Sequence, residues 1–185
     1  MQAKVITCFN QKGGSGKTTT ATQLADTFGR RGYTTAVADI DRQSTTSFLW
    51  GIQRAKDRVE TVIAPMAQFG DRYLEELAAL AKDCDLIFID CPPSLNLLTV
   101  NAMSAADSVL VPMQCEYFAL EGLTDLVNTI KQVRANMNPD LQIIGLLRVM
   151  FDPRTTLQQQ VSDQLKEHFG DKVFNSVIPR NVRLA

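Results

Sequence analysis

A glycine-rich segment near the start of the chain carries the most specific chemistry in the sequence. It reads Gln11-Lys12-Gly13-Gly14-Ser15-Gly16-Lys17-Thr18-Thr19. Glycines let the backbone curl so that several N–H groups point into one concavity, which binds phosphate oxygens. Lys17 can reach the outer phosphates of a nucleotide, and the Thr18 hydroxyl can ligate magnesium. The segment from Lys12 to Thr19 therefore predicts a loop that binds the phosphates of a nucleotide together with Mg2+.

This loop departs from the usual phosphate-loop pattern and carries an additional lysine. The usual pattern places a glycine five residues before Gly16, where this chain has Gln11. Lys12 has two interpretations that its spacing leaves open. It is either a solvated lysine of the loop or a second lysine for the phosphates, acting on those of a neighbouring subunit.

Acidic residues follow two of the apolar runs. Asp39 and Asp41 come at the end of one run, and Asp90 ends another. The carboxyl ends of parallel strands converge on one edge of the sheet, so these carboxylates are expected near the phosphate loop. Thr18, Asp39 and Asp90 are the predicted magnesium residues, directly or through water. Asp41 is the candidate to orient or activate the attacking water, although each acid taken alone could simply cap its strand.

Apolar runs of strand length alternate with helical patterns along the chain. The runs lie at residues 5–9, 35–39, 86–90, 108–112, 143–147 and 173–178. The helical patterns lie at residues 18–31, 73–81, 97–106, 120–137 and 156–169. Continuous apolar strands separated by helices predict an α/β fold in which a mainly parallel sheet has helices on both faces. The length of 185 residues favours a single domain, 1–185.

Composition limits the compartment and the partners. The net charge of -1 provides no global basic field, so any nucleic-acid binding has to come from a local patch. No apolar run reaches the length of a membrane span or of a signal-peptide core, which predicts a cytoplasmic protein without a membrane partner. The four cysteines are expected to be small buried residues in a reducing compartment: Cys8, Cys84, Cys91 and Cys115.

The phosphate loop resembles the deviant Walker A loop of the ParA/Soj and MinD class of ATPases. Three further segments, residues 90–95, 114–122 and 177–184, resemble the ParA/Soj branch of that class. The resemblance covers nearly the whole chain and is loosest across residues 51–82. It implies a P-loop NTPase fold that binds ATP and Mg2+.

The resemblance also implies roles for single residues. Lys12 matches the signature lysine, which in the family contacts nucleotide across a sandwich dimer. Lys17 and Thr18 match the phosphate and magnesium residues. Asp41 matches the acidic residue implicated in hydrolysis, and Asp90 matches the Walker B aspartate. The segment that resembles the stretch bordering the adenine is Pro179-Arg180-Asn181.

Family members bind DNA nonspecifically as ATP dimers, and a partner protein stimulates hydrolysis. The resemblance therefore implies an ATP-dependent homodimer, associated with the nucleoid, that hydrolyses ATP slowly and works with a ParB-like adaptor in plasmid or chromosome partition. Arg180 and Arg183 are the candidate DNA contacts, with Lys172 nearby in sequence. Two alternatives are a MinD-like or other cargo-positioning ATPase and a minimal nucleotide-binding scaffold with little turnover.

Three departures from the family pattern affect these expectations. Arg42 stands where the family usually has proline, beside Asp41. The stretch from residue 43 to 85 is shorter than in most relatives, so a strand or helix is expected to be missing there. The chain stops at Ala185, where relatives continue, which predicts a truncated or engineered chain without the family's C-terminal segment.

Overall fold

The computed structural model describes residues 3–41, 61–65 and 72–180. Within these residues seven strands form one sheet in the order β3-β2-β4-β1-β5-β6-β7, and every pair of neighbours is parallel. The strands are β1 (Lys4–Cys8), β2 (Thr35–Asp39), β3 (Thr61–Pro65), β4 (Leu86–Asp90), β5 (Ser108–Met113), β6 (Gln142–Phe151) and β7 (Val173–Pro179). The predicted parallel sheet is confirmed.

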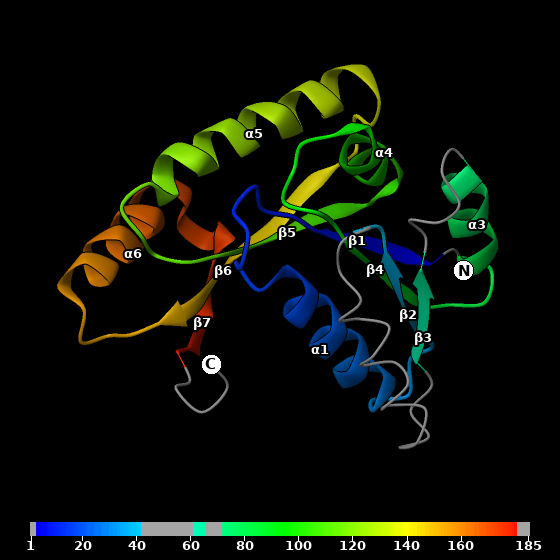
Figure 1. The fold of residues 1–185 in the computed structure, drawn as a ribbon, viewed down its shortest axis with the longest axis horizontal. Helices are drawn as coiled ribbons and strands as arrows, with labels where there is room; N and C mark the ends of the chain where they lie inside the picture. The colour runs from blue at the N-terminus through cyan, green and yellow to red at the C-terminus, as the bar shows by residue number, and fades with distance from the viewer. Residues whose placement is uncertain (1–2, 42–60, 66–71, 181–185) are drawn as a thin grey trace.

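Helices cover both faces of this sheet, as predicted. They are α1 (Lys17–Gly29), α3 (Tyr73–Leu80), α4 (Leu97–Ala105), α5 (Ala119–Asn136) and α6 (Thr156–Phe169), followed by the short 3-10 helix η2 (Gly170–Lys172). Figure 1 shows α4 and α5 on one side of the sheet and α1 on the other. Because β4, β1 and β5 are parallel neighbours, their carboxyl ends lie together at one edge of the sheet.

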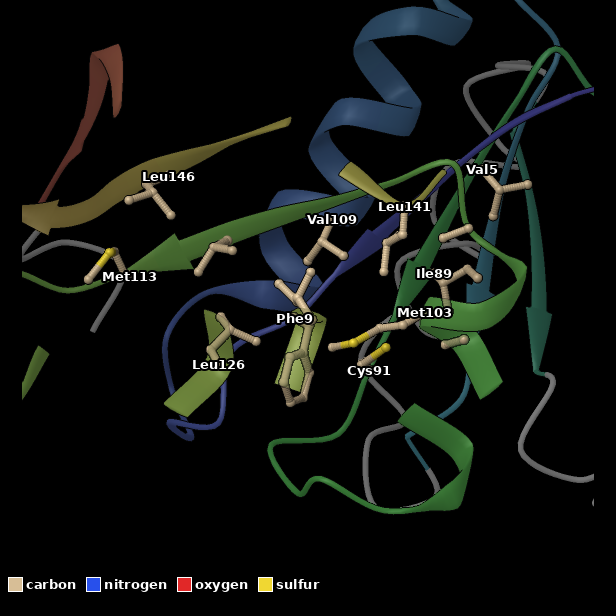
Figure 2. Packing of buried hydrophobic residues seen from close by; sticks show 14 of the residues in the cluster. Val5, Phe9, Ile89, Cys91, Met103, Val109, Met113, Leu126, Leu141 and Leu146 are labelled. Carbon is tan, nitrogen blue, oxygen red and sulfur yellow. The ribbon is translucent and has the colours of Figure 1, made fainter. Parts of the chain in front are cut away.

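Successive residues of each central strand enter two different apolar clusters. In β4, Ile87 and Ile89 pack into the larger cluster, whereas Phe88 packs with α1. Figure 2 shows the larger cluster, where Phe9, Met103 and residues of α5 meet. This alternation explains why the strands read as continuous apolar runs, since both of their faces are buried.

The predicted elements differ from the observed ones mainly in the least family-like stretch. The sequence predicted no strand between residues 43 and 85, yet β3 is present and pairs with β2 along its whole length. The predicted helix at residues 73–81 is confirmed as α3, and residues 42–60 and 66–71 of this stretch lie outside the described residues. The run at residues 143–147 belongs to a longer strand, β6. Arg42 lies outside the described residues.

The four cysteines are free and buried, as expected. Burial raises the pKa of each thiol above its ordinary value, and for Cys115 it raises the pKa to about 11. Thiols with such a raised pKa remain protonated and unreactive at neutral pH. In the part of the chain that the structure describes, no helix is both long and apolar enough to cross a membrane.

Candidate nucleotide-binding site

The glycine-rich loop connects β1 to α1 at the carboxyl edge of the sheet. Gly14 and Gly16 adopt left-handed backbone conformations, with φ angles of 70° and 78°. Residues with a Cβ rarely adopt these angles, so the turn into α1 requires glycine at both positions. Gly16 caps α1 without a side-chain hydrogen bond, and the first turn of α1 contains no acidic residue. The positive end of the helix is therefore available to an anion.

Lys17 begins α1 and is buried against the loop. Its side chain Nζ donates a hydrogen bond to the carbonyl of Lys12 at 3.1 Å. Burial lowers the pKa of Lys17, and the charge of Asp90 acts in the opposite direction. Lys17 as a whole is 7% exposed, and its ammonium has one carbonyl as its hydrogen-bond partner among the described residues. A buried cation with so few partners favours an anionic ligand.

Two predicted magnesium residues lie side by side on the other flank of the loop. Asp39 ends β2 and Asp90 ends β4, and the parallel register places them opposite each other. The backbone N–H of Asp41 donates to Asp39 Oδ1 at 3.0 Å, so all three predicted acids lie at this edge. The prediction that parallel strand ends would gather these carboxylates is thus met by the geometry.

Asp90 is the most unusual of these acids. It is fully buried, and neither carboxylate oxygen has a hydrogen-bond partner. Burial raises its pKa to about 7, the carboxylate of Asp39 adds to the rise, and the nearby Thr18 hydroxyl, which lies outside hydrogen-bond geometry, acts to lower it. A buried charged group without hydrogen bonds is costly in a folded protein. Its cost is offset when a cation binds it.

These residues fit a magnesium ion that is shared with a nucleotide. No three acidic, histidine or cysteine side chains converge to hold a metal ion by themselves, within residues 3–41, 61–65 and 72–180. Magnesium in nucleotide sites usually takes one or two carboxylates and completes its shell with water and phosphate oxygens. The orphaned oxygens of Asp90, with Asp39 beside them and the Thr18 hydroxyl nearby, match that arrangement.

Lys12 lies at the opposite end of the loop from Lys17 and has a different environment. Its side chain is half exposed and forms an ion pair with Glu116, which follows β5. Its backbone N–H donates to Asn10 Oδ1 at 3.0 Å. The sequence assigned no role to Glu116, because residues more than a hundred positions apart have no local pattern that links them.

Gln114 connects the phosphate loop to β6. This contact was not predicted from the sequence. The side-chain Nε2 of Gln114 donates to the carbonyl of Gly14 at 2.9 Å and approaches Met150 Sδ at 3.2 Å. Asn10 adds a second connection, because its Nδ2 donates to the carbonyl of Pro112 at 2.8 Å. The phosphate loop is therefore held by the Gln114 side chain, which follows β5, and by a backbone carbonyl of β5 that accepts from Asn10.

The predicted adenine segment reaches the same edge of the sheet. Pro179 ends β7, and the Arg180 N–H donates to the Phe151 carbonyl at 3.3 Å. Asn181 and Arg183 lie outside the described residues. Lys172 precedes β7, and its Nζ donates to the Ile143 carbonyl at 2.9 Å. Although Lys172 is near Arg180 in sequence, the whole length of β7 lies between the two basic residues and places them at opposite ends of that strand.

Comparison with known proteins agrees with this geometry. A family model described as an AAA domain matches residues 3–69 and 57–143. The chain is 40% identical to the chromosome partitioning protein ParA of Caulobacter vibrioides, covering 98% of this chain and 82% of the relative. It is 41% identical to the chromosome-partitioning ATPase Soj of Thermus thermophilus, covering 100% and 85%. The chain belongs to the ParA/Soj family of partition ATPases.

A solved structure extends the comparison beyond the ParA/Soj family. Cobyrinic acid a,c-diamide synthase from Mycobacterium smegmatis, with bound ADP and magnesium, superimposes with a TM-score of 0.80. It is 29% identical in sequence, and the match covers 97% of this chain and 87% of that one. The P-loop NTPase fold predicted from the sequence is thereby confirmed for this ParA/Soj chain.

Proposed function

We propose that this ParA/Soj chain, acting as one nucleotide-binding domain, binds ATP with magnesium and hydrolyses it slowly as a dimerisation switch in plasmid or chromosome partition. The observation that carries the proposal is the pairing of two buried groups across the start of α1. Lys17 is a cation with one carbonyl partner, and Asp90 is a carboxylate with none. Magnesium triphosphate supplies an anion for Lys17 and a cation for Asp90 in a single ligand.

Each predicted site residue has a distinct task in this proposal. The N–H groups of residues 13–19 and the ammonium of Lys17 bind the phosphates. Thr18, Asp39 and Asp90 hold magnesium, which neutralises charge on the phosphates when it is bound. Asp41 orients the attacking water, and its half-buried position beside Asp39 supports that task. Turnover below roughly 1 s⁻¹, near the low end of enzyme rates, suits a switch that must persist in its ATP state.

Lys12 is the residue proposed to act on a second subunit. The Lys12 side chain is half exposed, whereas Lys17 is buried. The Lys12 side chain can therefore leave Glu116 and reach a neighbouring molecule while the core stays closed. A half-exposed ion pair is weak and easily exchanged for another anion. The ATP-bound homodimer would then bind nonspecific DNA through Arg180 and Arg183 and respond to a ParB-like adaptor, in the cytoplasm on the nucleoid.

ATP binding is the first test of the proposal. Lys17→Ala should weaken binding of magnesium ATP by about 100-fold or more, because a charge-assisted contact in a buried site is lost. Isothermal titration calorimetry measures this, with Lys131→Ala, an exposed lysine on α5, as the matched control. Equal ATP affinity in wild type and Lys17→Ala would reject the phosphate-loop assignment.

Hydrolysis and dimerisation separate the switch from a simple scaffold. Asp41→Ala should bind ATP normally but release no phosphate, and Lys12→Ala should bind ATP without forming the dimer. Phosphate release and sedimentation with ATP or ADP measure these two properties. Absence of turnover in wild type, with and without DNA, would favour the minimal scaffold instead.

DNA binding is tested with the arginines of the last segment. Affinity should rise with ATP, fall steeply with salt and show no sequence preference, because the contacts are to phosphates. Arg180→Glu combined with Arg183→Glu should remove most of this affinity in a biosensor titration at two salt concentrations. Retained binding in the double variant would exclude these arginines as the DNA contacts.

A further inference from the structure

The start of the phosphate loop borders a cavity instead of a packed core. Residues 10–12 line a cavity of about 330 Å³ together with Leu123 and Leu126 of α5. Backbone that borders a cavity has no packing partners on that side. Hydrogen bonds must therefore fix the orientation of the peptide groups in this loop.

The backbone from Gly14 to Gly16 has the pattern of an anion-binding nest. Gly14 and Gly16 have positive φ angles, and Ser15 between them does not. Such an alternation makes successive N–H groups point into one concavity. Among the described residues, the N–H of Ser15 has no hydrogen-bond partner. This N–H is therefore available to a phosphate oxygen.

Gln114 holds the peptide group that joins Gly14 to Ser15. Its Nε2 donates to the Gly14 carbonyl at 2.9 Å. The peptide bond is trans, so its C=O and N–H point in opposite directions. The bond to Gln114 therefore directs the Ser15 N–H away from Gln114 and opposes a flip of this peptide group.

The Gln114 amide is itself held in place by β6. Its Nε2 lies 3.2 Å from Met150 Sδ, so the two hydrogens of the amide have one acceptor each. Met150 is the extra residue of a bulge between β6 and β7, and its φ angle is 52°. Its side chain is 41% exposed. Bulges and left-handed residues of this kind often redirect a side chain beside a functional site.

We propose that Gln114 is a positioning residue for phosphate binding, which holds the Gly14–Ser15 peptide so that the Ser15 N–H is oriented before the ligand arrives. The inference rests on the proposed ATP binding and extends it to a residue outside the phosphate loop. A nest that is already oriented binds its anion without first losing backbone freedom, and this preorganisation increases affinity.

The test uses a variant that keeps the length of the side chain and removes the donor. Gln114→Met should bind magnesium ATP and magnesium triphosphate about 5-fold more weakly than wild type, by the same factor for both ligands. Isothermal titration calorimetry measures both affinities. The urea midpoint of the nucleotide-free protein should change little, because the released loop relaxes.

The amide signal of Ser15 reports the peptide orientation directly. In ¹⁵N-labelled, nucleotide-free protein this signal should be sharp in wild type and exchange-broadened in Gln114→Met. Magnesium triphosphate should sharpen it in the variant. A loss of fold stability alone would not produce this pattern.

Gln159→Met is the matched control, because Gln159 Nε2 also donates to a backbone carbonyl, that of Pro153, at 2.9 Å. It should leave both affinities unchanged. Wild-type affinities in Gln114→Met, a loss for ATP alone, or a Ser15 signal as sharp as in wild type would overturn the role of Gln114 while ATP binding stands. Failure of the wild-type protein to bind either ligand would overturn both this inference and the proposed function.

Discussion

Two charged side chains are buried on opposite sides of β1, and their surroundings differ. Asp90, at the end of β4, has no hydrogen-bond partner for either oxygen. Arg148, in β6, donates from Nη1 to Ser162 Oγ at 2.8 Å and from Nη2 to the carbonyls of Phe174 and Asn175 at 2.8 and 3.2 Å. Both side chains are buried, but Nη1 and Nη2 of Arg148 are hydrogen-bonded and its Nε is not, whereas neither carboxylate oxygen of Asp90 has a partner.

The bonds of Arg148 have a local structural cause. Leu146 pairs with Val173 and Arg148 pairs with Val177, so β6 advances by two residues where β7 advances by four. Arg148 donates to the carbonyls of Phe174 and Asn175, which both lie within this extra length of β7. The contrast indicates that a buried charge with most of its hydrogen bonds made within the chain stabilises the fold. A buried charge whose bonds are unmet marks the place of a ligand.

The largest expected effect follows from removing the bonded charge. Arg148→Met should lower the free energy of unfolding by about 3 kcal/mol, because the buried Ser162 hydroxyl and two partly buried carbonyls lose their donor. Urea unfolding followed by circular dichroism measures this change. Arg154→Met is the control, since Arg154 is paired with Asp152 on the surface, and its unfolding midpoint should not move. Equal midpoints for wild type and Arg148→Met would remove the distinction between the two buried charges.

Removing the charge of Asp90 should change the free energy of unfolding in the opposite direction. Asp90→Asn should raise the free energy of unfolding of the nucleotide-free protein by about 1–3 kcal/mol at pH 8, since a buried carboxylate without hydrogen bonds is lost. The same variant should gain no stability from magnesium ATP, whereas wild type should gain it. A destabilised Asp90→Asn protein would show that Asp90 has a structural partner after all.

The pH dependence sharpens this prediction. Burial raises the pKa of Asp90 to about 7 from an ordinary value of 3.8, so the folded state binds this proton more tightly than the unfolded state. The contribution of Asp90 to stability should therefore fall as pH rises from about 4 to about 7. Unfolding free energies of wild type and Asp90→Asn, compared at pH 5, 6, 7 and 8, isolate this group. If the free energies of unfolding of wild type and Asp90→Asn changed equally with pH, the raised pKa of Asp90 would be contradicted.

The smallest expected effect concerns the packing that places β7 beside Arg148. A Cβ on Gly145 would lie 2.6 Å from two ring atoms of Phe174 and 3.0 Å from the Lys172 carbonyl oxygen. Gly145→Ala should therefore cost about 1–2 kcal/mol of stability, because the ring and the strand must both shift. Gly122→Ala, in open space on α5, is the control and should be neutral or slightly stabilising. A neutral Gly145→Ala would mean that β7 moves freely relative to β6.

Features with local signals could be predicted from the amino-acid sequence. The phosphate loop was predictable because its glycines, Lys17 and Thr18 act within nine consecutive residues. The gathering of Asp39 and Asp90 was predictable because parallel strands bring their carboxyl ends to one edge. The alternation of apolar runs and helical patterns predicted the layered fold, because a continuous apolar run indicates a strand that is buried on both faces.

Contacts that depend on strand register could not be predicted from the sequence and became visible in the folded chain. The short strand β3 forms by pairing with β2 at the edge, and its run of apolar residues was too brief to be distinguished from a loop. The pair of Lys12 with Glu116, the bridge from Gln114 to Met150 and the bonds of Arg148 join residues that are far apart in sequence. Each depends on a bulge or a strand order, and a shift of one residue in a strand would turn its side chains to the other face.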